Sequence, residues 1–364
     1  MTLFLSGDVM LGRGIDQILP HPGDPALRER YMDDARDYVA LAEAANGPIP
    51  RSAGFSWPWG DVLGVLADSA PDARIVNLET SVTRNDQFAP NKAVHYRMSP
   101  ANLPCLMASR PDVCVLANNH VLDLGQHGLE ETLEALADAG LQVAGAGLNA
   151  KQARQPAAVA VSHGGRVLVF SFGMASSGIP PWWVATDDRA GVDFVPELSE
   201  DIAAQITSRI RRHRRPGDIV VASVHWGSNW GYDIPDEQIR FAHALIDGVV
   251  DIVHGHSSHH PRPIEVYRDR LILYGCGDLI NDYEGIGGYE GYRADLRLMY
   301  LVSVESTGAL TGLRMVPMHT RRMRLHRASP GNAEWLREVL DSVSGGFGVR
   351  IDATAHGMLA LRRQ

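Results

Sequence analysis

The feature of this sequence that most constrains its fold is a repeated succession of short apolar runs, polar loops and amphipathic stretches. Short runs rich in valine and isoleucine, without alternating polar residues, are typical of strands that are buried on both faces of a sheet. Strands that alternate with helices indicate an α/β fold built in layers. The apolar runs occupy residues 3–5, 74–76, 113–116, 167–170, 219–224, 252–253 and 271–274.

Amphipathic stretches between these runs predict the helices. In residues 128–139 the side chains of Leu129, Leu133 and Leu136 fall on one stripe, and Gly140 is suited to end the helix. Similar patterns predict helices at residues 198–210, 235–248 and 332–343.

Two segments depart from this alternation. Residues 20–60 form a long excursion after the first strand, with a helical centre at 26–45 and an aromatic, proline-containing end. Connections of this length more often have a function than serve only as linkers, so we expect this one to cover a site. Residues 329–364 begin with Ser-Pro-Gly and predict a helix, a Gly-Gly turn and one strand. We therefore predict a main domain at 1–328 and a small C-terminal appendage at 329–364.

Composition limits the function. The 364 residues are 45% hydrophobic and 21% charged, which provides a sizeable core and excludes wholesale disorder. The net charge of −9 argues against a protein that mainly binds nucleic acid or an anionic membrane. We therefore interpret the arginine-rich residues 209–215 as the solvated end of a helix. The expected partner is a small-molecule or polyanionic substrate.

The start of the chain and its cysteines bear on the compartment. Residues 2–5 are apolar, but they lack a basic segment before them and a cleavage site after them, which predicts a buried strand instead of a signal peptide. Apolar stretches stay well below the roughly 20 residues that a membrane span needs. Three cysteines without paired spacing predict no disulfide framework. We expect a soluble, cytoplasmic protein without a membrane anchor.

Side chains of the kinds that bind metals follow the ends of the predicted strands, where open α/β sheets build their sites. Taken singly, an aspartate there is usually a cap, and a histidine is usually packed in a core. Taken together they favour a metal site, and oxygen and imidazole ligands without thiolate suit Mn, Zn or Fe. The residues concerned are Asp8, Asn77, Glu79, Asn118, Asn119, His120, Asp123, His225, His254, His256, His259, His260 and Asp278.

Five motifs among these residues resemble, in the same order, those of the CapA family. CapA proteins, also called capsule or poly-γ-glutamate biosynthesis proteins, are a branch of the calcineurin-like metallophosphoesterase superfamily. The resemblance covers roughly residues 1–320 and implies an α-β-β-α four-layer sandwich with two divalent metal ions at strand ends. The motifs are Gly-Asp-Val-Met at 7–10, Asn-Leu-Glu at 77–79, Asn-Asn-His at 118–120, His-Trp-Gly at 225–227 and Gly-His-x-x-His at 255–259.

The resemblance also implies roles for single residues. Asp8 matches an aspartate that binds the first metal, and Glu79 stands where the superfamily usually has its bridging aspartate. His120 matches the histidine that contacts the leaving group. The implied metal ligands are Asp8, Glu79, Asn119, His225, His256 and His259.

Other residues near these motifs have two interpretations each. Arg13 is suited to clamp a phosphate or carboxylate with its guanidinium, or to form a salt bridge at a helix start. Asp123 orients His120 or caps the following helix, and we favour the cap. Trp226 and Trp230 line the pocket or pack ordinarily, and for Trp230 we favour packing.

One position departs from the superfamily pattern. The first motif normally reads Asp-x-His, and Met10 occupies the histidine position here. A thioether is a poor ligand for a hard divalent ion. The first metal is therefore weakly held, absent, or completed by another group such as Asn77.

Three functions are compatible with the sequence. The first is a metal-dependent hydrolase of phosphoesters, with His120 as the acid. The second is a component of capsule or poly-γ-glutamate synthesis that acts on an anionic γ-glutamyl polymer. The third is a metal-binding scaffold without turnover.

Overall fold

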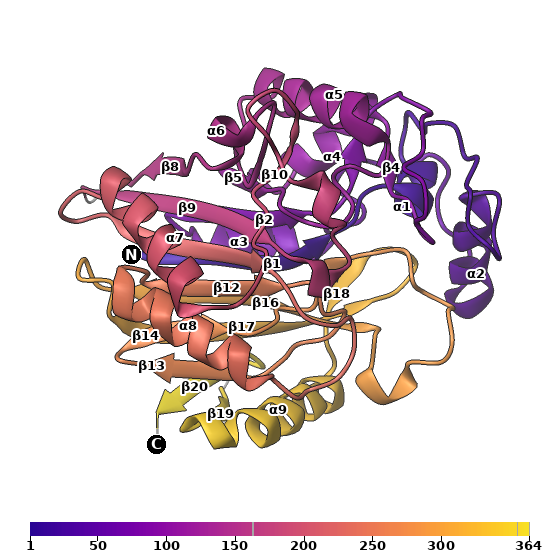
Figure 1. The fold of residues 1–364 in the computed structure, drawn as a ribbon. Helices are drawn as coiled ribbons and strands as arrows, with labels where there is room; N and C mark the ends of the chain where they lie inside the picture. Colours follow the sequence, from indigo (N-terminus) through magenta and orange to yellow (C-terminus); the bar gives the residue numbers. More distant parts are fainter. Residues whose placement is uncertain (162–163, 355, 364) are drawn as a thin grey trace.

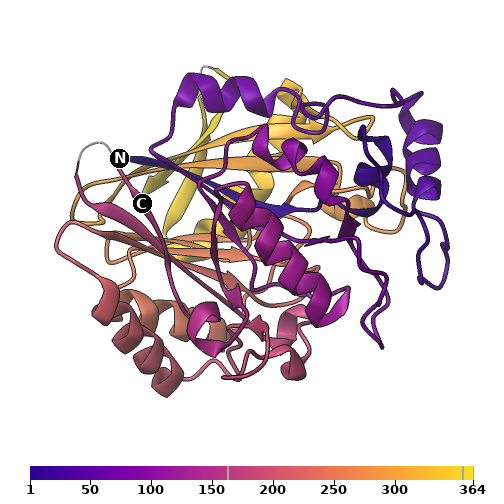
Figure 2. The same ribbon diagram turned by 90° about the horizontal axis from the view of Figure 1, so that it is seen from above.

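The computed structural model describes residues 1–161, 164–354 and 356–363. Two β-sheets lie face to face, and helices cover the outer face of each sheet (Figure 1). This arrangement confirms the predicted α-β-β-α four-layer sandwich. Both termini lie at one end of the molecule, and α2 (Arg36–Asn46) lies at the other end, toward which β1 (Thr2–Val9) runs (Figures 1 and 2).

The first sheet combines a parallel half with an antiparallel half. Strands β1, β2, β5 and β6 are parallel, whereas β16, β17, β20 and β19 continue the sheet with antiparallel pairing. The short strand β15 runs parallel to the end of β1, and β18 pairs with β17. In sheet order the strands are β19 (Val349–Ala353), β20 (Leu359–Arg363), β17 (Leu310–Thr320), β16 (Leu296–Val304), β1, β2 (Ala73–Leu78), β5 (Val113–Val115) and β6 (Gln142–Ala144), with β15 (Asp278–Ile280) and β18 (Leu325–Arg327) beside them.

In the second sheet β9, β11, β12 and β14 run parallel, and β8 and β13 form antiparallel edges. All seven strands predicted from the apolar runs are present, as β1, β2, β5, β9, β11, β12 and β14. The order is β13 (Ile264–Tyr267), β14 (Arg270–Leu273), β12 (Ile252–His256), β11 (Ile219–His225), β9 (Arg166–Gly173) and β8 (Ala157–Ala160). Two small pairs complete the strands, β3 (Ser81–Val82) with β4 (Arg97–Met98) and β7 (Ala146–Gly147) with β10 (Gly191–Val192).

Three apolar layers stabilise the sandwich. Between the sheets, Leu3 and Leu5 of β1 pack in one cluster with Val169 of β9 and Val221 of β11. Helices α1, α2, α3 and α5 cover the first sheet, and α7 and α8 cover the second. Among the described helices, none is both long and apolar enough to cross a bilayer. The helices other than α2 are α1 (Arg13–Ile18), α3 (Val62–Ser69), α4 (Pro104–Met107), α5 (Gly125–Asp138), α6 (Ala150–Ala153), α7 (Glu200–His213), α8 (Asp236–Gly248) and α9 (Pro330–Ser344), of which α5, α7, α8 and α9 confirm the predicted amphipathic stretches.

A buried hydrogen bond joins the two sheets near their carboxyl ends. His254 of β12 donates from Nε2 to the Ser6 carbonyl oxygen of β1 at 2.7 Å. Its Nδ1 lies 3.1 Å from Ser223 Oγ of β11. Burial lowers the pKa of His254 to about 4, so the ring is neutral, with one nitrogen donating and the other accepting. The end of β12 is thereby fixed against the end of β1.

The helix predicted at 26–45 is only half formed. α2 begins at Arg36, and the residues before it form a loop that is closed by an antiparallel bridge between Ala26 and Asp34. The Asp34 carboxylate accepts a hydrogen bond from the Arg36 backbone N–H at 2.8 Å. Local bonds of this kind compete with helix propagation. The helix prediction is therefore wrong for residues 26–35.

The C-terminal segment contains α9 and a hairpin of β19 and β20, which is one strand more than predicted. β20 pairs with β17 and so extends the first sheet. Leu336 and Leu340 of α9 lie in the apolar layer between the sheets. The described parts of this segment, α9, β19 and β20, thus share a core with the layers that precede them.

We predict that Leu340→Ala lowers the free energy of unfolding of the whole chain by about 2–5 kcal/mol, because it leaves a cavity in this shared layer. Urea unfolding followed by circular dichroism measures the change. Glu338→Ala, on the exposed face of the same helix, is the control and leaves the midpoint nearly unchanged. A separate early transition in the Leu340→Ala protein, with the main transition unmoved, would instead identify α9 as part of an independent appendage.

Candidate metal centre

Polar side chains from five chain segments meet at the edge of the sandwich toward which β1 runs. Asp8 ends β1 and His256 ends β12, and Asp8 Oδ1 lies 4.0 Å from His256 Nδ1 although the residues belong to different sheets. All members of the cluster except Asn119 are buried. Their role as metal ligands stays a prediction. The structure brings together Asp8, Glu79, Asn119, His225, His256 and His259.

The candidate ligands form two groups. Asp8 with His225 and His256 is one, Asp8 with His259 and Asp278 is the other, and in each group the ligand atoms lie within 4.8 Å of one another. Asp8 is thus common to both groups, whereas the family resemblance places the bridging residue at position 79.

Glu79 lies beside the first group. Its Oε1 is 3.8 Å from His225 Nε2. Its Oε2 is buried without a hydrogen-bond partner among the described residues. An unpartnered buried carboxylate oxygen is costly, and a cation beside it would remove that cost.

The imidazoles of the first group are neutral and suited to bind a metal. Burial lowers the pKa of His225 and that of His256 well below the ordinary value. Their Nδ1 atoms lie 2.7 Å apart, and His225 Nε2 lies 2.9 Å from Asn119 Oδ1. His256 Nε2 lies 2.8 Å from Ser223 Oγ, a contact of the kind that orients metal-binding imidazoles.

The carboxylates of the site are buried, so the repulsion between their negative charges is little screened by solvent. Burial raises the pKa of Asp8, and the charge of Asp278 adds to the rise. Burial and the charge of Asp8 raise the pKa of Glu79 well above its ordinary value. Divalent cations would relieve this repulsion, and a donor set of oxygen and imidazole suits Mn, Zn or Fe. The residues present therefore fit the metal ions that the family resemblance implies.

His120 lies beside this cluster and is held by Asp123. Asp123 Oδ2 accepts hydrogen bonds from His120 Nδ1 at 2.6 Å and from the Tyr96 backbone N–H at 2.6 Å. The Lys92 ammonium contacts the other Asp123 oxygen. No described side chain caps α5. The preference for Asp123 as a helix cap is therefore wrong, because its oxygens are occupied by these three neighbours.

Arg13 is buried in a network of ion pairs. Its Nε and Nη2 donate to Asp282 at 2.8 and 2.5 Å, and Nη1 donates to Glu29 at 2.9 Å. The guanidinium carbon lies 3.6 Å from the centre of the Tyr38 ring. Of its two interpretations, the structure shows the salt bridge at a helix start. The guanidinium donates its hydrogen bonds to residues of this chain. Through Glu29 and Tyr38 the excursion 20–60 contacts Arg13.

We predict that Arg13→Met lowers the free energy of unfolding by about 3–5 kcal/mol, because it leaves the buried Asp282 carboxylate without its ion-pair partner. Denaturant unfolding at neutral pH measures the effect. The control is Arg36→Met, which removes an exposed ion pair with Asp34 and leaves stability nearly unchanged. Equal stability of the two variants would mean that the buried pair contributes no more than the exposed one.

A cavity of about 280 Å³ opens onto the cluster. Glu79, His120 and His259 line it together with Lys92 and Tyr283. The lining residues come from segments other than 20–60, so the expectation that this excursion covers the site is not met at the cavity itself.

The two tryptophans have different surroundings. Trp226 is buried and stacks on Tyr274, so it belongs to the core of the second sheet. Trp230 stacks on Tyr289 with ring centroids 4.0 Å apart and lies 5.3 Å from the His259 ring. Trp230 therefore packs against a neighbouring loop and against a candidate ligand at once.

Two residues of the site, Asp278 and Lys92, have no role that is predicted from the sequence. Asp278 Oδ1 lies 3.0 Å from His259 Nδ1. The signal for Asp278 was a Gly-Asp pair after the apolar run at 271–274. Lys92 follows no predicted strand, so neither periodicity nor a motif marks it. Asn77, suggested as the replacement ligand, donates Nδ2 to Asp8 Oδ1 at 2.7 Å and so turns a donor toward the site.

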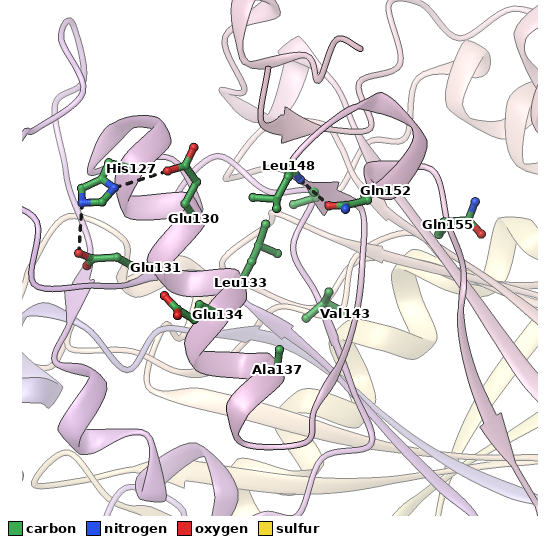
Figure 3. A pocket seen from close by; sticks show the side chains of 12 residues that line it. His127, Glu130, Glu131, Leu133, Glu134, Ala137, Val143, Leu148, Gln152 and Gln155 are labelled. Carbon is green, nitrogen blue, oxygen red and sulfur yellow. Dashed lines mark hydrogen bonds and ion pairs between the residues drawn. The ribbon is translucent and has the colours of Figure 1, made fainter. Parts of the chain in front are cut away.

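A second groove, of about 740 Å³, lies apart from the cluster and is lined by α5 and the residues around α6 (Figure 3). His127 Nδ1 lies 3.5 Å from Glu130 Oε2, and His127 Nε2 lies 3.4 Å from Glu131 Oε1. The His127 side chain is largely exposed. Leu133 and Leu148 add apolar surface. These pairs are ordinary helix-surface contacts.

The side chains of three arginines in 209–215 contact other parts of this chain. Arg209 pairs with Asp193 and Arg214 with Asp251. Arg211 donates to the carbonyl oxygen at Gly248 at 3.1 Å. They surround the C-terminal end of α7, where positive charge is favourable.

Comparison with known proteins identifies the family. The profile of the family described as "Bacterial capsule synthesis protein PGA_cap" matches residues 2–283. The chain is 53% identical over 353 residues to a probable polyglutamine synthesis accessory protein of Mycobacterium tuberculosis, which covers 96% of this chain and 93% of that protein. It is 26% identical over 309 residues to the PGA biosynthesis protein CapA of Bacillus subtilis, covering 83% and 68% respectively.

The chain therefore belongs to this family of bacterial capsule synthesis proteins, which confirms the resemblance to CapA. Among solved structures, the 5'-nucleotidase precursor from Thermus thermophilus is similar with a TM-score of 0.49 and 13% identity. That alignment covers 95% of this chain and 58% of the nucleotidase chain.

Proposed function

We propose that this protein is a metal-dependent hydrolase that cleaves a phosphoester. One observation carries the proposal: neutral imidazoles and buried carboxylates meet beside a small cavity that His120, held by an aspartate, also lines. The ligands would be Asp8, Glu79, Asn119, His225, His256 and His259. When bound there, two divalent ions would supply a water of lowered pKa and neutralise charge on a phosphoryl group.

His120 is suited to protonate the leaving oxygen. Burial lowers its pKa to about 4, although the charge of Asp123 opposes this, so the ring is neutral at neutral pH in the free protein. Nδ1 donates to Asp123, and Nε2 lies 3.8 Å from Glu79 Oε1 on the cavity side. An anionic phosphoryl group in the cavity would raise the pKa of His120, because an opposite charge favours the imidazolium. The proton on Nε2 would then be available to the leaving group.

Asp123 and Lys92 position His120. The carboxylate of Asp123 fixes which ring nitrogen carries the proton and which way the ring faces. Lys92 contacts Asp123 and the Asn119 carbonyl oxygen, and its Nζ lies 3.3 Å from His120 Nδ1. These contacts hold Lys92 against the segment that carries both the candidate ligand Asn119 and His120.

We predict that His120→Asn lowers turnover of an alkyl phosphodiester by about 10²–10⁴-fold. A nitrophenyl phosphodiester should lose much less, because nitrophenolate departs without a proton. Steady-state rates on the two esters, with metal content measured on the same samples, test this. An equal loss on both esters, or a loss of metal, would argue against an acid role for His120.

Asp123→Asn should lower turnover of the alkyl ester about as far as His120→Asn does, because it removes the acceptor that orients the ring. The double variant should be no slower than either single variant, since residues that act as one unit are not additive. Rates of the three proteins at equal metal loading measure this. Independent, multiplying losses would contradict the positioning role.

A second candidate function is supported by the relatives, whose names refer to polyglutamine synthesis and to PGA biosynthesis. It is cleavage or transfer at an amide of an anionic γ-glutamyl polymer. Incubation of the manganese-loaded protein with poly-γ-glutamate, followed by size analysis, separates the two candidates. Turnover of the polymer alone would replace the phosphoester proposal, and full metal loading without turnover of either substrate would favour a metal-binding scaffold.

A further inference from the structure

We infer that Asp278 is a metal ligand that takes the place of the histidine missing at Met10. The half-site formed by Asp8, His259 and Asp278 is then richer in oxygen ligands than the half-site formed by Asp8, His225 and His256. This inference rests on the metal-binding part of the proposed function. The family resemblance gives Asp278 no role, and the sequence offered Asn77 instead.

The backbone brings Asp278 to Asp8. The two residues are register partners in the parallel pair of β1 and β15, and both are buried. A Cβ atom at Gly7 would lie 1.5 Å from the carbonyl oxygen of Gly277, so only glycine permits this approach. Gly277 itself has a φ of +73°, a conformation that side chains disfavour. Glycines before both aspartates thus allow the two carboxylates to face one site.

The separations are those of atoms that share an ion. Asp278 Oδ1 lies 3.0 Å from His259 Nδ1, and both lie within 4.8 Å of the nearest Asp8 oxygen. Two ligands at about 2.1 Å from one ion and at right angles lie about 3 Å apart. Asp8, His259 and Asp278 can therefore surround a single cation with little movement.

Neighbouring side chains orient the Asp278 carboxylate. Its Oδ2 accepts a hydrogen bond from Asn281 Nδ2 at 2.5 Å. Asn281 Oδ1 accepts one from Arg297 Nη2 at 2.8 Å, and Arg297 is only 1% exposed. Oδ1 stays on the side of His259. Hydrogen bonds behind a carboxylate are the usual way in which a metal ligand is held in place.

The position of β15 explains why Met10 is tolerated. The backbone N–H of Met10 donates to the Ile280 carbonyl oxygen at 2.8 Å, so β15 lies alongside this part of β1. A neighbouring strand therefore provides a carboxylate where the first motif lacks an imidazole. Asn77 does not fill this place, because its Nδ2 faces Asp8 and its Oδ1 accepts from Asn118.

The two half-sites then differ in chemistry. Asp8, Asp278 and His259 offer two carboxylates and one imidazole, a set that suits Mn²⁺. Asp8, His225 and His256 offer two imidazoles and one carboxylate, which suits Zn²⁺ or Fe²⁺ as well. The Asp278 half-site should therefore retain Mn²⁺ in competition with Zn²⁺ better than the other half-site does.

The direct test is a crystal of the wild-type protein soaked in Mn²⁺, with anomalous scattering collected at the manganese edge. We expect two peaks, one of them within about 2.3 Å of an Asp278 oxygen. A peak bonded to His259 while Asp278 only hydrogen-bonds to that histidine would overturn the inference and make Asp278 an orienting residue.

The solution test compares metal content after dialysis against Mn²⁺, for the wild type, Asp278→Asn and the control Asp295→Asn, whose carboxylate pairs with Arg293 and His319. We expect two equivalents in the wild type and in Asp295→Asn, and one in Asp278→Asn. Loss of an orienting residue alone costs about 10–100-fold in affinity, and loss of a ligand should exceed that range. Asp278→His should shift the affected site toward Zn²⁺.

The outcomes separate this inference from the proposed function. Two equivalents of unchanged affinity in Asp278→Asn would overturn the inference and leave the proposed function intact. A wild type that binds no Mn²⁺ or Zn²⁺ would overturn both. The expected metal contents without phosphoester turnover would uphold the role of Asp278 while the hydrolase proposal fails. Thermal unfolding of each variant shows that the comparison is made between folded proteins.

Discussion

The hydrogen bond from His254 to the Ser6 carbonyl oxygen is the contact on which the geometry of the site depends. The candidate ligands come from two sheets, and apolar packing alone sets the spacing of sheets without fixing how they slide over each other. The two partners of the bond lie two residues from His256 and from Asp8, respectively. The bond therefore fixes the position of β1 relative to β12 in the buried interior. A carboxylate and an imidazole from different sheets consequently approach to 4.0 Å.

The sequence predicts which edge of the sandwich carries the site. Asp8, Asn119 and His225 each come directly or almost directly after an apolar run, and the carboxyl ends of parallel strands share one edge. The buried parallel strands were predicted from short apolar runs without alternation, which are typical of strands covered on both faces. That ligands from two different sheets would meet was implied only by the family resemblance, because periodicity does not show how sheets stack.

Other features depend on contacts that a linear pattern does not contain. Asp278 belongs to a three-residue strand whose partner, β1, lies at the opposite end of the family-matched region of the chain. Lys92 reaches Asp123 from an irregular loop. The start of α2 is set by a local bond of Asp34 that outweighs helix propensity. The long strand β16 is different: its inward residues Leu296, Leu298, Tyr300 and Val302 alternate along the sequence, a usable signal in a segment for which no strand was predicted.

The glycine before Asp8 shows that part of the electrostatics of this centre is encoded by a residue without charge or side chain. Gly7 permits two negatively charged groups to be neighbours by letting one main chain touch another. Even a methyl group there would force the strands apart and loosen the cluster while every acidic and basic residue stayed in place. A comparison of ionisable residues alone would therefore find no difference between such a variant and the natural chain, although the spacing of the carboxylates had been lost.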